Sequence, residues 1–128
     1  MEKTDAKSIK KVAVIGAGLM GRAIAFVFSS KYRVAVYDIN PIDLYGGVRE
    51  IVKELVEFGV LTEDELERRL SQLHLVTQLD HEDIANADLI VESVFEDMAI
   101  KKKTFADLEK ICRDDCIFCT NTSVMSPT

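Results

Sequence analysis

The sequence lacks any stretch of about 20 apolar residues, the length that a helix needs to cross a bilayer. It also lacks the features of a secretory signal, because its first ten residues are polar and charged and contain no apolar segment. We therefore expect residues 1–10 to be a disordered lead-in, and we expect a soluble, cytoplasmic protein without a membrane partner.

The sequence also has no excess of positive charge. The formal net charge is −6, so the overall electrostatic field repels nucleic acids and anionic membranes. We expect no nucleic-acid partner. An anionic ligand would have to be held by the local geometry of its site.

Cysteine is scarce and is confined to one part of the chain. Cys112, Cys116 and Cys119 are odd in number, which does not suit a secreted disulfide framework, and their spacing does not match the paired C-x-x-C ligands of zinc sites. We interpret them as reduced, partly buried thiols, and we predict no metal site.

What remains is a chain of 128 residues, of which 48 % are hydrophobic, and this is enough for one domain with its own core. Short apolar runs predict strands at 11–15, 33–37, 73–77, 88–94 and 116–120. Helical spacing or capping residues predict helices at 19–30, 40–58, 62–70, 82–85 and 98–112. Because strand alternates with helix and no hairpin turn intervenes, we predict an α/β domain at 11–128, with a parallel sheet and helices on both faces.

Two of these helices have recognisable starting signals. Asn40 followed by Pro41 is typical of an N-cap and a first helical residue, and an apolar stripe follows as far as Phe58, before Gly59. Thr62 and Glu65 have the spacing of a capping box.

A glycine motif, Gly16-Ala17-Gly18-Leu19-Met20-Gly21, follows the first predicted strand directly and opens the first predicted helix. In this context Gly16 permits a tight turn, Gly18 lets the backbone approach a pyrophosphate, and Gly21 permits close helix packing. The helix N-terminus, with Leu19 and Met20, supplies free N–H groups and the positive end of a dipole. The motif predicts a Rossmann-type doubly wound sheet that binds a dinucleotide; the alternative is a purely structural glycine turn.

Asp38 ends the second predicted strand, where a carboxylate can accept hydrogen bonds from both hydroxyls of the adenine ribose. The same carboxylate would repel a 2′-phosphate, and Ile39 and Asn40 provide no neighbouring cation to relieve that repulsion. The predicted cofactor is therefore NAD rather than NADP. The alternative for Asp38 is a turn-forming residue.

Several segments together carry a resemblance to a known family. They are Val-Ile-Gly-Ala-Gly-Leu-Met-Gly at 14–21, Tyr-Asp-Ile-Asn at 37–40, Gly-Val-Leu-Thr-Glu-Asp-Glu at 59–65, Ala-Asp-Leu-Ile-Val-Glu-Ser-Val-Phe-Glu-Asp at 87–97 and Asn-Thr-Ser at 121–123. With them, nearly the whole chain resembles the N-terminal, NAD-binding domain of the L-3-hydroxyacyl-CoA dehydrogenases.

The resemblance implies an NAD-dependent oxidation of L-3-hydroxyacyl-CoA to 3-oxoacyl-CoA, as in fatty acid β-oxidation or butanoate metabolism. It implies that Glu96 and Lys101 lie by the nicotinamide half of NAD and that Asn121 belongs to the cofactor site. Ser123 would be the catalytic, substrate-orienting residue where the cofactor meets the acyl-CoA. From the residues alone, Glu96 could instead favour a helix start, Lys101 could lie on a solvated helix face, and Asn121 and Ser123 could cap a turn.

The family's catalytic base, a histidine oriented by a glutamate, would lie beyond the end of this chain, since His74 and His81 fall outside the family's motif. The helical C-terminal domain that completes the site and usually forms the homodimer is also absent. We therefore expect this chain alone to bind NAD with little turnover. The segment 38–59 is shorter than in typical relatives, and Val124 stands where a second serine is often found.

The chain ends at Thr128, just past a predicted strand, which suggests a domain cut from a longer protein. A stand-alone NAD-binding module without catalysis and a related dehydrogenase acting on a sugar acid such as gulonate are the alternatives. The sequence leaves open the acyl chain length, a fusion to a hydratase and the oligomeric state.

Overall fold

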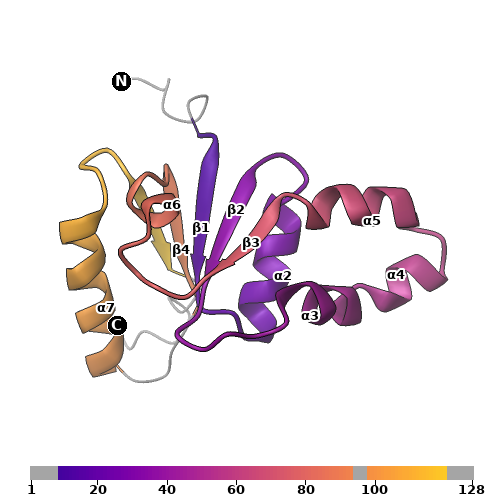
Figure 1. Cartoon of the computed structure of the whole chain (residues 1–128), viewed down its shortest axis with the longest axis horizontal. Coiled ribbons are helices and arrows are strands. Elements are labelled where there is room, and N and C mark those ends of the chain that lie inside the picture. Colours follow the sequence, from indigo (N-terminus) through magenta and orange to yellow (C-terminus); the bar gives the residue numbers. More distant parts are fainter. Residues whose placement is uncertain (1–8, 94–97, 121–128) are drawn as a thin grey trace.

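Parallel strands form the centre of the structure, a computed structural model that describes residues 9–93 and 98–120 (Figure 1). They are β1 (Lys11–Ile15), β2 (Arg33–Tyr37), β3 (Leu73–Val76), β4 (Leu89–Glu92) and β5 (Ile117–Thr120). They pair in parallel in the order β3-β2-β1-β4-β5. This order confirms the predicted doubly wound, Rossmann-type sheet, in which the chain builds outward from β1 in both directions.

Helices cover both faces of this sheet (Figure 1). The helices of the described residues are α2 (Leu19–Phe28), α3 (Leu44–Ile51), α4 (Lys53–Glu57), α5 (Glu63–Leu70), α6 (Glu82–Ala85) and α7 (Met98–Ile111). The helices α2 and α3 pack on one face and α6 and α7 on the other.

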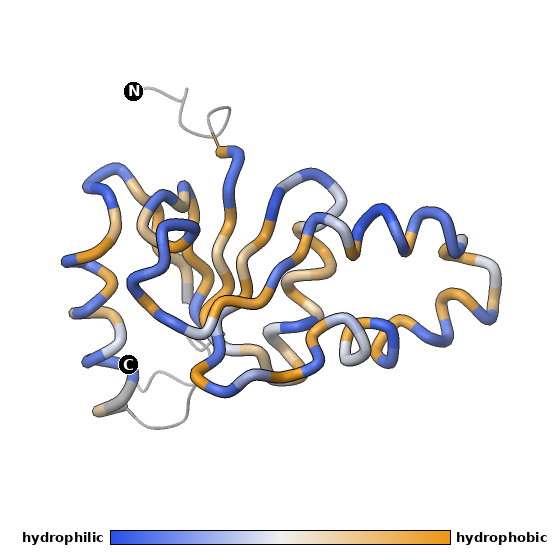
Figure 2. Tube along the Cα trace, in the orientation of Figure 1, coloured by the Kyte–Doolittle hydropathy of each residue, from blue (hydrophilic) through white to orange (hydrophobic). Residues whose placement is uncertain are grey.

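Alternate residues of the central strands enter two separate cores. Val12 and Val14 of β1 pack with the apolar side chains of α2 and α3, whereas Ala13 and Ile15 pack with those of α6 and α7. Successive side chains of a strand point to opposite faces, so a strand buried on both sides must be apolar throughout. Figure 2 shows these hydrophobic strands at the centre of the molecule.

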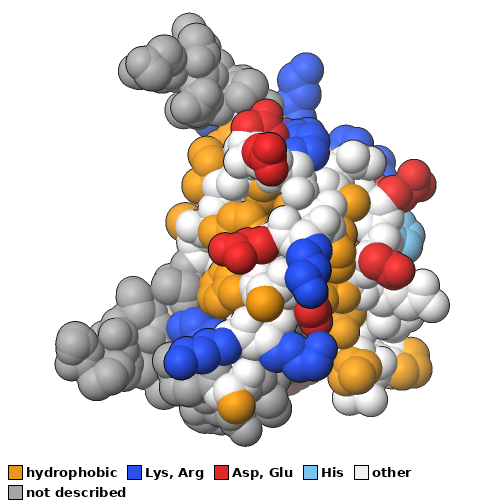
Figure 3. Space-filling view, turned by 90° about the vertical axis from the view of Figure 1, so that its left-hand side faces the viewer, with side chains coloured by type: hydrophobic (Ala, Val, Ile, Leu, Met, Phe, Trp, Pro, Cys, Tyr) orange, Lys and Arg blue, Asp and Glu red, His pale blue; other side chains and the backbone are white. Residues whose placement is uncertain are grey.

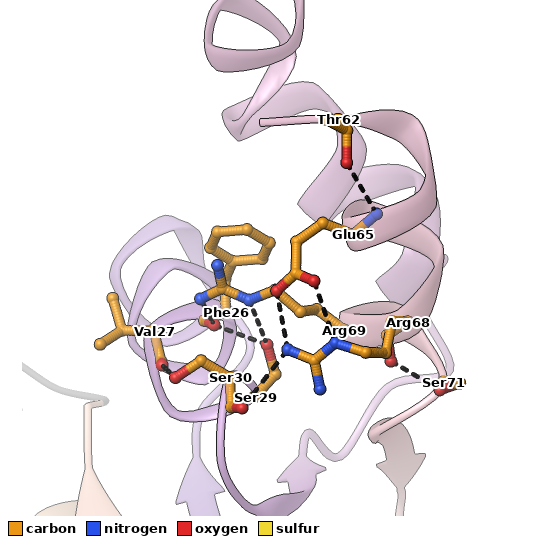
Figure 4. Close-up of polar contacts among 9 residues, drawn as sticks. All are labelled: Phe26, Val27, Ser29, Ser30, Thr62, Glu65, Arg68, Arg69 and Ser71. Atoms are coloured by element: carbon orange, nitrogen blue, oxygen red, sulfur yellow. Dashed lines mark hydrogen bonds and ion pairs between the residues drawn. The ribbon is translucent and has the colours of Figure 1, made fainter. Parts of the chain in front are cut away.

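The helices α4 and α5 form an arm that extends away from the sheet (Figure 1). Its base is fixed at the C-terminal end of α2. The guanidinium of Arg69 lies 3.9 Å from the ring centroid of Phe26 and donates to the Phe26 carbonyl at 2.7 Å, while Arg68 reaches the Ser30 carbonyl at 3.4 Å (Figure 4). Cations at this end satisfy the last carbonyls of α2 and complement the helix dipole.

The helix predicted at 40–58 is wrong in its start and in its continuity. Asn40 is not its N-cap, because the Asn40 N–H donates to Asp38 Oδ1 at 2.9 Å and this bond holds Asn40 in a turn. The helix begins instead at Leu44, where Asp43 caps it by accepting from the Gly46 N–H at 3.0 Å. It is also divided at Val52 into α3 and α4.

The apolar stripe predicted along this segment is buried only in its first half. Leu44 and Val48 lie in the core, whereas Leu55 and Phe58 are exposed, Phe58 to 78 %. Leu55 and Phe58 lie in the arm, which extends away from the sheet. The predicted end before Gly59 is confirmed, as is the Thr62 cap of α5, which accepts from the Glu65 N–H at 3.1 Å.

The N-terminal lead-in is shorter than predicted. Ile9 packs against the core, and the Lys10 N–H donates to Asp88 Oδ2 at 2.9 Å, so the packed chain includes these two residues. Residues 1–8 lie outside the described residues.

Among residues 9–93 and 98–120, no helix has both the length and the apolar character that crossing a membrane requires.

Candidate cofactor site

The glycine turn joins β1 to α2 at the carboxyl edge of the sheet. Gly16 has a φ of 111°, which side chains disfavour, and its N–H donates to the Tyr37 carbonyl at 2.8 Å. A Cβ on Gly21 would collide with the Gly16 carbonyl oxygen, so the first turn of α2 can lie against β1 only with glycine there. The turn therefore has the tight bend and close packing that the motif predicts.

The N-terminus of α2 differs in its capping from those of α3, α5 and α6. Side chains of Asp43, Thr62 and His81 cap those three helices, whereas Gly18 at the N-cap of α2 offers no side chain, and the first turn of α2 contains no acidic residue. A Cβ on Gly18 would meet no atom within 4 Å. Leu19 and Met20 are both more than half exposed. Among the described residues, no side chain caps the start of α2, as an anion site there requires.

Asp38 lies directly beside this turn. Its carboxylate accepts from the Ala17 N–H at 3.3 Å through Oδ2 and from the Asn40 N–H at 2.9 Å through Oδ1. Each carboxylate oxygen has a second lone pair, so these bonds orient the group without exhausting its capacity to accept from ribose hydroxyls. The structure therefore brings Asp38 next to the glycine turn.

A buried ion pair lies on the other side of the turn. Glu92 ends β4 in register with Ile15 of β1, and its side chain is 0 % exposed. Lys101 in α7 approaches it, with Nζ 3.5 Å from Oε1. Lys101 is thus placed at the carboxyl edge of the sheet, near the glycine turn.

Ser93 supplies a test of whether a dinucleotide fits. Its Oγ is buried, has no hydrogen-bond partner among the described residues, and lies 3.2 Å from where a Cβ of Gly21 would be. A buried hydroxyl without a partner is costly unless a ligand or an ordered water satisfies it. With the open N-terminus of α2 and the nearby Asp38, this arrangement fits NAD.

Several predicted site residues cannot be placed. Glu96, Asn121 and Ser123 lie outside the described residues, as does Val124. Their assignments to the cofactor and to the substrate stay predictions. Within residues 9–93 and 98–120, no group of three or more His, Cys, Asp or Glu side chains could hold a metal ion.

The two histidines lie together on the side of the sheet that ends in β3. His74 is half-buried in β3, with Nε2 2.5 Å from Asp83 Oδ2, and His81 caps α6 by accepting from the Asp83 N–H at 3.0 Å. Burial raises the pKa of Asp83, but the contacts with both histidines outweigh it and leave the pKa below its ordinary value. Both imidazoles thus have local structural partners, on β3 and α6.

Sequence reasoning assigned no role to Glu92, Ser93 or Arg22. Arg22 is half-buried in the first turn of α2, and its Nε donates to the Gly18 carbonyl at 3.2 Å. The sequence carries one signal for Glu92, which is an acidic residue at the end of the apolar run Leu-Ile-Val-Glu. A buried strand rarely ends in an acidic residue that has no partner.

Comparison with known proteins agrees with this geometry. The family model described as "3-hydroxyacyl-CoA dehydrogenase, NAD binding domain" matches residues 11–128. The chain is 39 % identical over 123 residues to a peroxisomal fatty acid beta-oxidation multifunctional protein of Oryza sativa subsp. japonica, covering 93 % of this chain and 17 % of that protein. It is 38 % identical over 125 residues to the 3-hydroxyadipyl-CoA dehydrogenase of Escherichia coli (strain K12), covering 94 % and 26 %.

Among solved structures, a 3-hydroxybutyryl-CoA dehydrogenase from Escherichia coli K12 is similar, with a TM-score of 0.81 and 36 % identity. The match covers 91 % of this chain and 25 % of that one. The chain therefore spans about a sixth to a quarter of the length of these relatives.

Proposed function

This chain belongs to the 3-hydroxyacyl-CoA dehydrogenase family, as its NAD-binding domain, and we propose on that basis that the protein oxidises L-3-hydroxyacyl-CoA to 3-oxoacyl-CoA. The observation that carries the proposal is the open glycine turn beside Asp38, within a family match that includes residues 11–128. Fatty acid β-oxidation or butanoate metabolism is the proposed context.

NAD, when bound, supplies the acceptor for the hydride that leaves the 3-carbon of the substrate. The part of this chain is to hold that cofactor. The N–H groups at the start of α2 hold the diphosphate, and Asp38 accepts from the adenine ribose. We assign Glu96 and Lys101 to the nicotinamide half, Asn121 to the cofactor site, and Ser123 to orienting the substrate, as the resemblance to the family implies.

Removing the proton of the 3-hydroxyl requires a base within hydrogen-bond reach of it. We propose that this base is a histidine outside this chain. His74 and His81 are engaged with Asp83 on the β3 side of the sheet, whereas Glu92 and Lys101 lie on the β4 side. Alone, the chain should bind NAD and turn over little substrate.

We further propose that the complete protein works in the cytoplasm as a homodimer on an acyl-CoA, a small-molecule substrate, without a nucleic-acid or membrane partner. The net charge of −6 supports a small-molecule ligand held by local geometry over a polyanionic partner.

The experiment is an assay of the full-length protein encoded by the gene. NADH formation should be followed with 3-hydroxybutyryl-CoA, longer 3-hydroxyacyl-CoA thioesters, 3-hydroxyadipyl-CoA and gulonate. Turnover of one or more of the thioesters is the expected result. NAD binding without turnover of any of them would favour a binding module without catalysis, and turnover of gulonate alone would favour a sugar-acid dehydrogenase.

A further inference from the structure

Glu92 is a charged group in an unusual place. It ends a strand whose residues are buried, and no part of its side chain is exposed. A carboxylate keeps its charge in such surroundings only when opposite charge or hydrogen bonds compensate for the lost hydration. The compensation visible here is the ammonium of Lys101, 3.5 Å away.

Lys101 differs in exposure from the neighbouring lysines of α7. Its side chain is 15 % exposed, whereas Lys102 and Lys103 are exposed, and Lys103 pairs with Asp107 on the surface. Figure 3 shows this side of the molecule, where basic side chains lie among acidic and hydrophobic ones. Lys101 alone among these three thus turns inward, toward the end of β4.

The topology places this ion pair under one half of a bound dinucleotide. Asp38 at the end of β2 marks the adenosine half, and the glycine turn after β1 marks the diphosphate. Because β4 and β5 lie on the other side of β1, the nicotinamide half must extend over them. Glu92 is the residue of β4 in register with the last residue of β1, so it lies where that half begins.

We propose that the Glu92–Lys101 pair sets the ratio of the affinities for NAD⁺ and NADH. The nicotinamide ring is positively charged in NAD⁺ and neutral in NADH, so a fixed charge beside it affects the two forms differently. In the intact pair the two charges oppose each other. Charges of one sign in a partly dehydrated site act over several ångströms with little screening. The inference needs only that the chain binds NAD, and not that the protein oxidises an acyl-CoA.

The test compares two variants of this chain that change the local charge in opposite directions. Glu92→Gln removes one negative charge beside Lys101 and should weaken NAD⁺ relative to NADH. Lys101→Met leaves the anion and should favour NAD⁺ relative to NADH. We expect the ratio Kd(NAD⁺)/Kd(NADH) to rise about threefold or more in the first variant and to fall by a similar factor in the second. Both constants can be measured by calorimetry in the same buffer for every variant.

Two controls separate a charge effect from damage to the fold. Lys102→Met removes the same charge from an exposed neighbour and should leave the ratio unchanged. ADP-ribose lacks the nicotinamide ring and its charge, so a variant that still binds ADP-ribose keeps the rest of the cofactor site. Lys101→Met changes a surface-reaching side chain and should fold even if the buried Glu92→Gln does not.

Opposite shifts of the ratio in the two variants support the proposal, and so does the shift in Lys101→Met alone if Glu92→Gln does not fold. A ratio that moves in the same direction in both variants, or stays within about twofold of the unmodified chain in Lys101→Met, overturns it. If the unmodified chain binds none of the three nucleotides, NAD binding itself fails, which is a different result. An inactive full-length protein would leave this inference untouched.

Discussion

The carboxylate of Asp38 accepts a hydrogen bond from the backbone N–H of Ala17, 3.3 Å away and inside the glycine turn. This bond joins Asp38, the predicted contact of the adenine ribose, to the glycine turn, the predicted contact of the diphosphate. It also orients the carboxylate toward the turn before any ligand arrives. A preoriented acceptor loses less conformational entropy on binding than a mobile one.

Asp38→Asn should therefore weaken NAD binding. An amide keeps one acceptor oxygen but loses the charge, and charge-assisted hydrogen bonds are about twice as strong as neutral ones. We expect Kd for NAD to rise about tenfold or more, which corresponds to about 1.4 kcal/mol. Isothermal calorimetry measures it directly.

Asp43→Asn is the matched control. Asp43 is exposed and caps α3, and asparagine caps helices as well as aspartate does, so this variant removes a nearby charge without touching the ribose position. Equal NAD affinity in Asp38→Asn and in the unmodified chain would remove Asp38 from the ribose.

Substitutions at Gly18 and Gly21 should separate an effect on NAD binding from an effect on the stability of the fold. A Cβ on Gly18 meets no atom within 4 Å, so Gly18→Ala should leave the free energy of unfolding nearly unchanged and should weaken NAD binding, because the methyl group enters the space of the diphosphate. Denaturant unfolding and calorimetry on the same preparation give both quantities.

Gly21→Ala should behave in the opposite way. Its Cβ would collide with the Gly16 carbonyl oxygen, and the backbone must shift to accept it. We expect a loss of about 1–3 kcal/mol in the free energy of unfolding, as for other overpacked sites. If Gly18→Ala were the destabilised variant and Gly21→Ala the stable one, the geometry of the turn described above would be wrong.

The parts that sequence predicted well are those in which local chemistry fixes the backbone. The predicted bounds of β1 and β2 match the structure because each strand is a short apolar run, ended by Gly16 or Asp38. The glycine turn was predictable for the same reason, since the motif encodes a positive φ at Gly16 and a close approach at Gly21.

The start of α3 could not be predicted, because Asn40 and Asp43 are both good caps. What decides between them is the hydrogen bond from the Asn40 N–H to Asp38. The pairing of Glu92 with Lys101 could not be predicted either, because no local pattern pairs the end of a strand with a lysine nine positions later. Both depend on tertiary contacts that no local pattern contains.

Acid should destabilise the fold partly through Asp88. Burial raises the pKa of this carboxyl, but hydrogen bonds from the Arg113 guanidinium and from the N–H groups of Lys10 and Lys11 outweigh burial and lower the pKa below its ordinary value. A depressed pKa contributes stability above the unfolded-state pKa of about 4, and that stability is lost as the pH falls through the folded-state pKa.

Asp88→Asn should thus lower the free energy of unfolding at pH 7, by about 1–3 kcal/mol for lost charged hydrogen bonds. Its stability should also fall less steeply than that of the unmodified chain below about pH 4. Urea titrations across the pH range measure both effects. Asp114→Asn, which changes an exposed carboxyl between α7 and β5, is the control and should change neither. Parallel pH profiles for Asp88→Asn and the unmodified chain would contradict the assignment.

The three thiols should react at very different rates. Cys112 is buried and its Sγ donates to the Ile84 carbonyl at 3.5 Å, and burial raises its pKa. Burial and the neighbouring Cys112 raise the pKa of Cys116 to about 12. Cys119 in β5 is exposed. Because the thiolate is the reactive form, we expect one fast equivalent per chain with iodoacetamide at about pH 8, located at Cys119 by mass spectrometry. Cys119→Ser should abolish the fast phase, and rapid labelling of Cys116 in the folded chain would show that its thiol is not held in the environment described.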